Sequence, residues 1–190
     1  MYCTLEDRIK LIKQYCLKEK SKNPIEILNH IMKQDFISIH GPEHHVLDGA
    51  AFLTAMHNAG EDFDLALALD ELSERGLQMP GATCGLWGVC GSAASIGAAL
   101  AVLHKTGPIS DTEYYKHNME YVSKALSRLA KIGGPRCCKR NAYLSTLAAI
   151  EFVKEKYGIE LEKGKVTCTF SKFNKQCIGK RCPFNSNSAC

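Results

Sequence analysis

The sequence lacks the features that would place the chain in a membrane or mark it for export. Its longest apolar run, residues 92–103, is shorter than the roughly 18 residues that a membrane span requires. Its first ten residues carry charges of both signs where a signal peptide would be apolar. We therefore expect a cytoplasmic protein with no membrane partner, in which cysteines stay reduced.

The chain also shows no strong bias of composition. Charged residues make up 23%, aromatic residues 8% and hydrophobic residues 45%, which excludes a disordered chain, a collagen and a coiled coil. With 190 residues it can bury a core in one domain without covalent staples. It nevertheless contains 10 cysteines. Disulfides of a secreted protein are one interpretation, but without an export signal we favour thiols that bind metal or react.

The spacing of apolar residues predicts an all-α fold. We expect a single helical domain of about seven helices, residues 1–164, and an irregular cysteine-rich tail, residues 165–190, packed on it. The tail has too few aliphatic residues for a core of its own, so metal or packing should order it. The expected helices span residues 5–18, 24–32, 42–58, 65–74 (stopped by Gly76), 88–104, 111–131 and 135–157.

Three of these helices begin with a Gly/Pro turn that carries potential ligands. The turns are HGPEHH at 40–45, PGATCGLWGVCG at 80–91 and GGPRCCKRN at 133–141. A helix N-terminus offers unpaired N–H groups and partial positive charge, which favour anions and lower the pKa of thiols. If the three termini converge, they form a pocket for a thiolate-bound metal cluster or an anionic substrate. Ordinary turns would explain the Gly and Pro residues but not the Cys and His residues.

Four cysteines in these turns are candidate metal ligands. Cys84 and Cys90 are separated by five residues, a looser gap than zinc knuckles use, and two buried apolar thiols are the alternative. Cys137 and Cys138 are adjacent. Because neighbouring side chains diverge on a helix, one could ligate a cluster and leave the other as a reactive thiol. A turn at the helix start could also let both reach a large centre.

Basic residues surround the adjacent cysteines. Arg136, Lys139 and Arg140 would lower the thiol pKa values and could bind a carboxylate or phosphate of an anionic substrate. A solvated helix end is the alternative. Positive charge at a helix N-terminus is unfavourable, however, unless an anion sits there.

The first turn supplies the candidate proton-transfer residues. His40, Glu43 and His44, with His45 beside them, could bind metal or move protons. A capping cluster, with Glu43 complementing the helix dipole, is the alternative. The spacing is not that of the His-Glu-x-x-His zinc proteases.

The tail carries three further candidate metal ligands, Cys168, Cys177 and Cys182, spaced Cys-x8-Cys-x4-Cys. Residues 163–190 also hold six basic residues and no acid. The spacing resembles zinc fingers with three Cys and one His that bind RNA. Three Cys around an open position also suit a [4Fe–4S] cluster whose free iron binds substrate.

This tail departs from the zinc-finger pattern at its end. Asn185 and Ser186 stand where the His is expected, so the fourth ligand would be Cys190, a residue of the body or an open position. The three Phe residues of the tail could stack bases, but they more simply dock the tail on the body. Metal binding is thus expected more strongly than nucleic-acid binding.

The three turns and the tail string CIGKRCPF resemble a prokaryotic domain family of unknown function, over about residues 35–185. Members look like stand-alone domains or follow an S-adenosylmethionine-dependent methyltransferase domain. The resemblance implies no reaction, and this chain lacks a Gly-rich nucleotide loop, so methyl transfer is not expected of it. The resemblance leaves Cys3, Cys16 and Cys190 outside the shared pattern. The cysteines that it includes are Cys84, Cys90, Cys137, Cys138, Cys168, Cys177 and Cys182.

Together these features predict a cytosolic metal-binding protein with an iron–sulfur cluster of the [4Fe–4S] type, or with zinc as the alternative. We expect an enzyme of small-molecule or sulfur metabolism that acts on a small anionic substrate. Desulfuration or dehydration fits, because both need a Lewis acid and a positioned base. The alternatives are a zinc-binding RNA or protein adaptor, and a metal or sulfur carrier for a methyltransferase partner.

Overall fold

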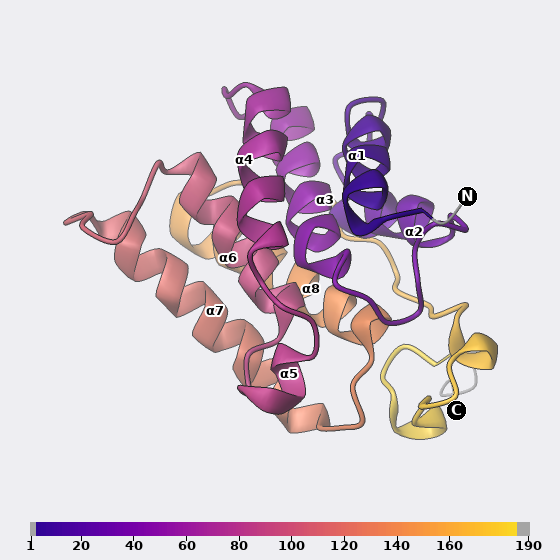
Figure 1. Ribbon diagram of the computed structural model, residues 1–190. Coiled ribbons are helices and arrows are strands. Elements are labelled where there is room, and N and C mark those ends of the chain that lie inside the picture. The colour runs from indigo at the N-terminus through magenta and orange to yellow at the C-terminus, as the bar shows by residue number, and fades with distance from the viewer. Residues whose placement is uncertain (1–2, 186–190) are drawn as a thin grey trace.

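The helices of the computed structural model, which describes residues 3–185, confirm the all-α class (Figure 1). Eight α-helices form instead of about seven, because α5 is a single turn too short to show a periodic pattern. Within the described residues, the one β pairing is an isolated bridge between Cys168 and Asn185. The helices are α1 (Leu5–Cys16), α2 (Pro24–Met32), α3 (His44–Ala59), α4 (Leu65–Leu77), α5 (Thr83–Leu86), α6 (Gly91–Leu103), α7 (Glu113–Ile132) and α8 (Cys138–Tyr157).

Local chemistry sets most of the helix ends. Thr4 and Asp7 form a reciprocal capping box at the start of α1, in which each backbone N–H donates to the other side chain. The Asn23 side chain accepts from the first turn of α2. Gly60 and Gly158 end α3 and α8 in the left-handed conformation, as their positions in the sequence predict.

Several predicted boundaries differ from the structure by two or three residues, such as the start of α6 at Gly91 rather than residue 88, and the end of the fourth helix differs for a packing reason. Gly76 was expected to stop the fourth helix at Glu74, but α4 runs through it to Leu77. A Cβ at Gly76 would lie 2.4 Å from a methyl group of Val46, so its missing side chain serves close packing against α3. The last helix begins at Cys138 rather than near Pro135, because Pro135 belongs to the preceding turn.

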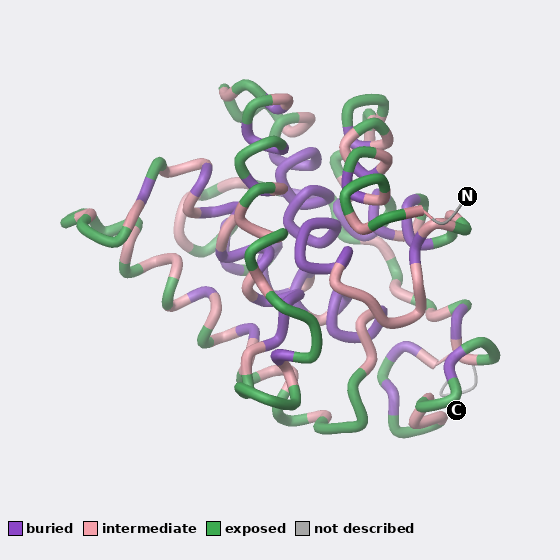
Figure 2. Tube along the Cα trace, viewed as in Figure 1, coloured by how far each residue is buried: buried purple, intermediate pink, exposed green. Residues whose placement is uncertain are grey.

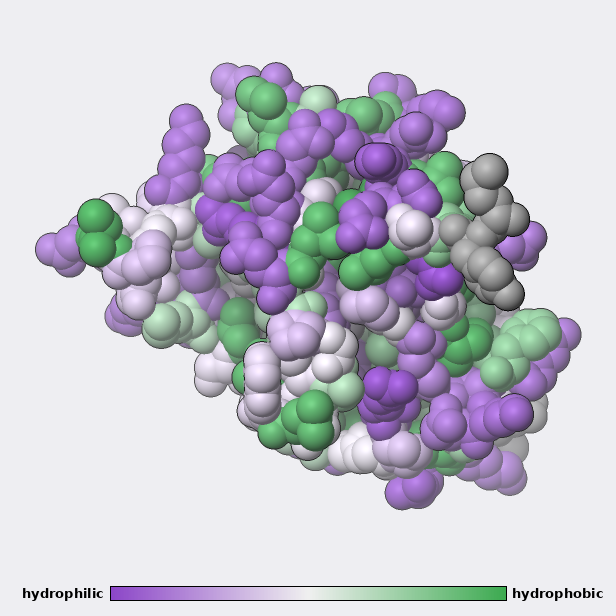
Figure 3. All heavy atoms as spheres, in the orientation of Figure 1, coloured by the Kyte–Doolittle hydropathy of each residue, from purple (hydrophilic) through white to green (hydrophobic). Residues whose placement is uncertain are grey.

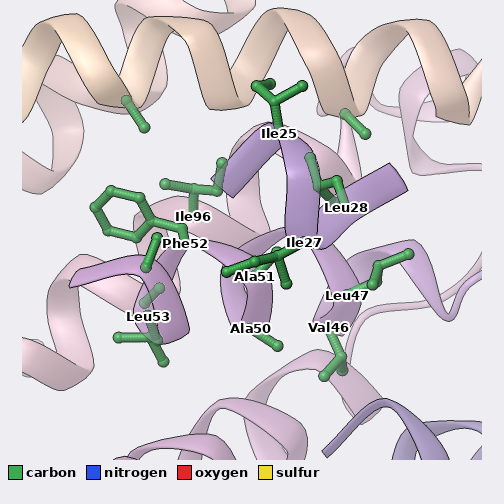
Figure 4. Close-up of a cluster of buried hydrophobic side chains, with 14 of the residues drawn as sticks. Ile25, Ile27, Leu28, Val46, Leu47, Ala50, Ala51, Phe52, Leu53 and Ile96 are labelled. Atoms are coloured by element: carbon green, nitrogen blue, oxygen red, sulfur yellow. The ribbon is translucent and has the colours of Figure 1, made fainter. Parts of the chain in front are cut away.

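Helix α3 lies at the centre of the domain. All residues from its start to Met56 are buried, and α1, α2, α4, α6 and α8 pack around it (Figure 2). Figure 4 shows Val46, Leu47 and Phe52 of α3 among isoleucines of α2 and α6. A helix covered on every side must be apolar all round rather than on one stripe. The buried acid Asp48 is therefore an exception within α3.

The crossing of α3 and α6 depends on small residues. The backbone N–H of Gly49 donates to Ser95 Oγ at 2.9 Å. A Cβ at Gly49 would lie 2.5 Å from the Ser95 carbonyl oxygen, closer than side chains tolerate. The two helix backbones can approach this closely only because residue 49 lacks a side chain.

We predict that Gly49→Ala lowers the free energy of unfolding by about 1–3 kcal/mol, because the added methyl forces α3 and α6 apart. Gly85→Ala in α5 is the control, since a Cβ there meets nothing within 4 Å. Urea unfolding monitored by circular dichroism measures both. Equal stability of the two variants would contradict this account of the crossing.

An aromatic cluster joins the end of α6 to α7 and α8. The His104 ring stacks on Tyr114 with centroids 4.0 Å apart and meets Tyr157 edge-on at 5.0 Å. Burial lowers the pKa of His104 to about 4, and the nearby His117 adds to this. The histidine is therefore held in its neutral form.

This pKa predicts a pH dependence of stability. Between about pH 4 and the ordinary histidine value near 6.5, the unfolded chain binds a proton at His104 that the folded chain does not. Stability therefore falls as the pH drops through this window. His104→Phe keeps an aromatic ring at this position and removes the titrating group. The unfolding free energy of the variant should therefore fall less steeply from pH 7 to pH 4 than that of the wild type, as measured by urea titrations. An unchanged slope would contradict the assignment.

The tail turns back across the start of α8 (Figure 1). It is irregular apart from two short 3-10 turns, η1 (Ser171–Phe173) and η2 (Gly179–Arg181). Phe170 and Phe184 are buried, and the Phe184 ring packs on Tyr143 of α8 with centroids 5.3 Å apart. Aromatic docking on the body thus helps to order a tail that has few aliphatic residues.

The surface carries mostly polar groups. On the face in Figure 3, hydrophilic side chains predominate and apolar ones form separate small patches. Leu86 and Trp87, at and just after the end of α5, are strongly exposed. None of the helices within residues 3–185 has the length and apolar character needed to cross a membrane.

Candidate metal centre and adjoining cavity

The seven cysteines expected as metal ligands line two neighbouring cavities. The first, here called the four-thiol cavity, lies between the start of α8 and the tail and has a volume of about 20 Å³. Its cysteines are Cys137, Cys168, Cys177 and Cys182. The second, the three-thiol cavity, has a volume of about 150 Å³. Its cysteines are Cys84, Cys90 and Cys138. The nine cysteines of the described residues carry free thiols.

The adjacent cysteines at the start of α8 face different cavities. Cys137 precedes the helix and Cys138 is its first residue, so their side chains diverge. Cys137 is the body residue that joins the three cysteines of the tail. Cys190, the other candidate for this place, lies outside the described residues.

Backbone and amide N–H groups surround the sulfurs of the four-thiol cavity. The N–H of Phe170 donates to Cys168 Sγ at 3.4 Å, and that of Gly179 donates to Cys177 Sγ at 3.5 Å. In both cases the donor lies two residues after the cysteine. Such donors stabilise a thiolate and orient it toward a metal.

Cys137 receives its own set of donors. The Arg140 N–H in the first turn of α8 donates to its Sγ at 3.4 Å, and Asn174 Nδ2 of the tail donates at 3.4 Å. Cys137 thereby caps α8 and lies at the positive end of the helix dipole. This position suits a negatively charged sulfur.

Two buried cations line the four-thiol cavity. Lys139 is 1% exposed, and its Nζ has no hydrogen-bond partner within residues 3–185. It lies 5.0 Å from the centroid of the Phe170 ring. Nη1 of Arg140 is also buried and unpartnered in this part of the chain. A buried lysine without a hydrogen-bond partner and a buried arginine with one unpartnered nitrogen, both beside four thiols, indicate a place for a negatively charged metal–thiolate group.

The pKa values are consistent with this electrostatic setting. Burial lowers the pKa of Lys139 to about 8, although Asp48 and Glu43 counteract the shift. Burial also raises the pKa of the Cys137 and Cys168 thiols. A bound cation would reverse the cysteine shifts, because metal ligation requires thiolates.

The four thiols line one small cavity. Across residues 3–185, no three Cys, His, Asp or Glu side chains form a group that could hold one metal ion. The residues of the cavity fit a thiolate-bound group in their chemistry: four sulfurs, N–H donors and cations.

The three predicted helix N-termini meet at the three-thiol cavity. His44 at the start of α3, Gly91 at the start of α6 and Cys138 at the start of α8 all line it. Gly91 is required by this close approach, since a Cβ there would lie 2.0 Å from the His45 ring. The three helix starts therefore converge and line one pocket.

A histidine–carboxylate pair lies in the wall of this cavity. His44 Nδ1 and Asp48 Oδ1 are 3.1 Å apart, and both side chains are buried. Because a carboxylate oxygen accepts hydrogen bonds, Nδ1 is the nitrogen that carries the proton. Nε2 of His44 has no partner in the described part of the chain.

Glu43 and His40 have different surroundings from those expected of catalytic groups. The Glu43 carboxylate is buried, accepts from the Ser38 N–H at 2.7 Å and meets Arg8 at 3.4 Å, and it does not line the three-thiol cavity. Burial would raise its pKa, but hydrogen bonds from its own backbone and from Ser38 outweigh this and lower it. His40 does line the three-thiol cavity, and its buried Nδ1 has no hydrogen-bond partner within residues 3–185, while its Nε2 contacts Asn174 and Gln176 of the tail, each at 3.0 Å.

The three basic residues expected to bind substrate are divided between the two cavities, as the cysteines are. Arg136 is exposed and lines the three-thiol cavity, where it can meet an anion. Lys139 and Arg140 line the four-thiol cavity. Arg140 also donates to the carbonyl oxygens of Gly133 and Pro135, which ties it to its own turn.

Three further residues in or beside these cavities were not anticipated from the sequence. Asp48 could have been found as the one acid in an otherwise apolar stretch, four residues after His44. Asn141 donates to Cys90 Sγ at 3.2 Å, and Asn174 joins His40 to Cys137. Asn174 carried no recognisable signal, because its contacts reach from the tail to distant parts of the chain.

The fold and the two cavities define a small helical protein rich in clustered thiols. The chain belongs to a family of unknown function, DUF5714, whose model matches residues 12–185. The match begins ahead of residue 35, so it includes part of α1. No curated protein and no solved structure matches the chain.

The buried ammonium of Lys139 leads to a stability prediction. In chain freed of metal by a chelator, Lys139→Met should raise the free energy of unfolding by about 1–2 kcal/mol, because it removes a buried unpartnered charge at nearly constant volume. Urea unfolding in the presence of chelator measures the change. The control Lys131→Met lies at an exposed position and should change stability by less than about 0.5 kcal/mol. Destabilisation by Lys139→Met would show that the ammonium has a partner.

Proposed function

We propose that this protein is a metal-dependent enzyme of small-molecule or sulfur metabolism that holds an iron–sulfur cluster in the four-thiol cavity. The observation that carries the proposal is the gathering of Cys137 with Cys168, Cys177 and Cys182 around one cavity. These residues come from a helix start and from a tail that otherwise has little regular structure. A bound centre would join the two parts.

The surroundings of the thiols support a ligating role. Buried thiols that serve only as packing need neither N–H donors nor cations. Here Phe170, Gly179 and Arg140 direct N–H groups at sulfurs, while Lys139 supplies buried positive charge. Hydrogen bonds to sulfur and nearby charge are the means by which proteins tune iron–sulfur centres.

Four cysteine thiols suit both a cluster and a single zinc ion. A structural zinc site takes four ligands at tetrahedral positions, and a [4Fe–4S] cluster takes three or four thiolates. We place the cluster first because N–H donors to sulfur and a buried lysine are features that tune iron–sulfur sites.

A cluster held by three of the four cysteines would keep one iron open and supply Lewis acidity, whereas a cluster held by all four would supply electrons. The chain's own residues would then retain the charged centre, with Lys139 and Arg140 offsetting its negative charge. Phe170 and Phe184 exclude water from its tail side. Desulfuration and dehydration of a small anionic molecule remain the reaction types that this combination suits.

The proposed RNA adaptor has weaker support. Of the tail's three phenylalanines, Phe170 and Phe184 are buried, while Phe173 is exposed. Two of the three rings therefore dock the tail instead of offering faces for base stacking.

Anaerobic purification followed by metal and sulfide analysis tests the proposal. We expect brown protein with iron and acid-labile sulfide in about equal amounts, and visible absorption from thiolate-to-iron charge transfer. Colourless protein with about one zinc per chain would replace the cluster with the zinc alternative. Protein without either metal after reconstitution would overturn the metal centre itself.

The adjacent cysteines provide a matched pair for the same test. Cys137→Ser removes a proposed ligand and should abolish most of the bound iron, whereas Cys138→Ser, one residue away but in the other cavity, should retain it. Iron per chain after identical reconstitution is the measurement. Equal loss in both variants would mean that the two cavities share one centre.

A further inference from the structure

The three-thiol cavity contains two buried polar groups that have no role in the metal centre. His44 is 1% exposed and Thr83 is 2% exposed, and both line the cavity. Their side-chain atoms Nε2 and Oγ1 have no hydrogen-bond partner in residues 3–185. A buried polar atom without a partner costs free energy, so each of these atoms leaves a place for a polar group of a bound molecule.

The charge around this cavity favours an anion. The starts of α3, α6 and α8 line this cavity, and the dipole of each helix contributes partial positive charge there. Arg136 adds a full positive charge at the rim and can contact a carboxylate or a phosphate through two N–H groups. The cavity is therefore suited to a small molecule with one such group.

Asp48 gives the histidine a defined orientation. Its Oδ1 accepts from Nδ1 of His44 at 3.1 Å, which holds the imidazole from inside α3 and keeps Nε2 on the far side of the ring from Asp48. A carboxylate behind a histidine has this effect on the ring in hydrolytic triads and in metal sites. Asp48 is wholly buried, so its position is set by the packing of the central helix.

We propose that the three-thiol cavity is the substrate site for a small carboxylate- or phosphate-bearing molecule, and that Asp48 positions His44 so that Nε2 accepts a proton from the molecule bound there. This inference rests on the proposed function, because it assigns the substrate site of the same enzyme. His44 is the catalytic residue, Asp48 is a positioning residue and Arg136 binds the anionic group.

The cavity thiols allow the anion site to be tested without knowing the substrate. Iodoacetate carries a carboxylate, whereas iodoacetamide is its neutral analogue, and both alkylate cysteine. In the native protein, the rate ratio of iodoacetate to iodoacetamide at Cys84 and Cys138 should exceed the ratio for the same residues in urea by about tenfold. Modification by iodoacetate should saturate with concentration. Peptide mass spectrometry measures both rates.

Arg136→Gln should lower this ratio by about three- to tenfold, because it removes the charged contact to the carboxylate. Lys131→Gln, which makes the same change of charge at an exposed position outside the cavity, should leave the ratio unchanged. Protection by acetate or by inorganic phosphate identifies which anion the cavity prefers. A ratio equal to that in urea, without saturation, would overturn the anion site.

The role of Asp48 is tested by the tautomer of His44. In ¹⁵N correlation spectra of the native protein, we expect the His44 proton on Nδ1, with Nε2 free. Asp48→Asn should move part of the population to the Nε2–H form, while His45, whose Nδ1 contacts the Met79 carbonyl oxygen at 3.1 Å, keeps its tautomer. A wild-type proton on Nε2 would overturn the positioning role even if the variant failed to fold.

The metal content of the same samples separates this inference from the proposed function. If iron is present but the alkylation ratio shows no preference for the anion, the substrate site is wrong and the cluster stands. If the preference and the tautomer are as expected but no metal is bound, the metal centre is wrong and the anion site stands.

Discussion

The burial of α3 on every side is the constraint on which both cavities depend. Five helices pack around it, so its direction and its first turn are fixed by the core. Where Gly49 crosses Ser95, the backbones of α3 and α6 lie so close together that the helix cannot shift without a steric clash. The starts of α6 and α8 are held against the start of α3 in consequence, and the loops ahead of these helices bring their thiols and histidines together.

This arrangement separates stability from chemistry along the length of α3. From Val46 to Met56 the helix supplies apolar packing, while its first turn supplies His44 and His45 to a cavity. Asp48 lies where the two parts meet. A buried acid costs stability unless it is paired, and its partner is the histidine one turn earlier. The core therefore holds a polar group whose value lies in orienting another residue.

The sequence was sufficient for the features that arise from local chemistry. The helix class, the caps at Asn23 and Asp64 and the stops at Gly60 and Gly158 follow from spacing and from single residues. The end of α4 did not follow, because Gly76 can stop a helix or permit close packing, and only the neighbouring Val46 decides which. The helix α5 was missed because a single turn is too short to show a periodic pattern of apolar residues.

The residue types of the candidate site were predictable from the sequence, but the division of its cysteines between two cavities was not. The seven cysteines stand out in the sequence, yet their grouping depends on where the tail crosses α8, a contact between segments far apart in the chain. Arg136 and Arg140 differ for the same reason. They lie only four positions apart at the start of α8, yet the tertiary packing leaves Arg136 exposed and buries Arg140.

The division at Cys137 and Cys138 also means that the two cavities are separated by a single peptide unit. Such a unit is planar and resists twisting, and it spans about 3.8 Å between its Cα atoms. The separation of the two Cα atoms is therefore fixed, whereas each thiol can still turn about its own Cα–Cβ bond. Any group that holds the backbone of Cys137 in place thus also limits where the backbone of Cys138 can lie beside the other cavity.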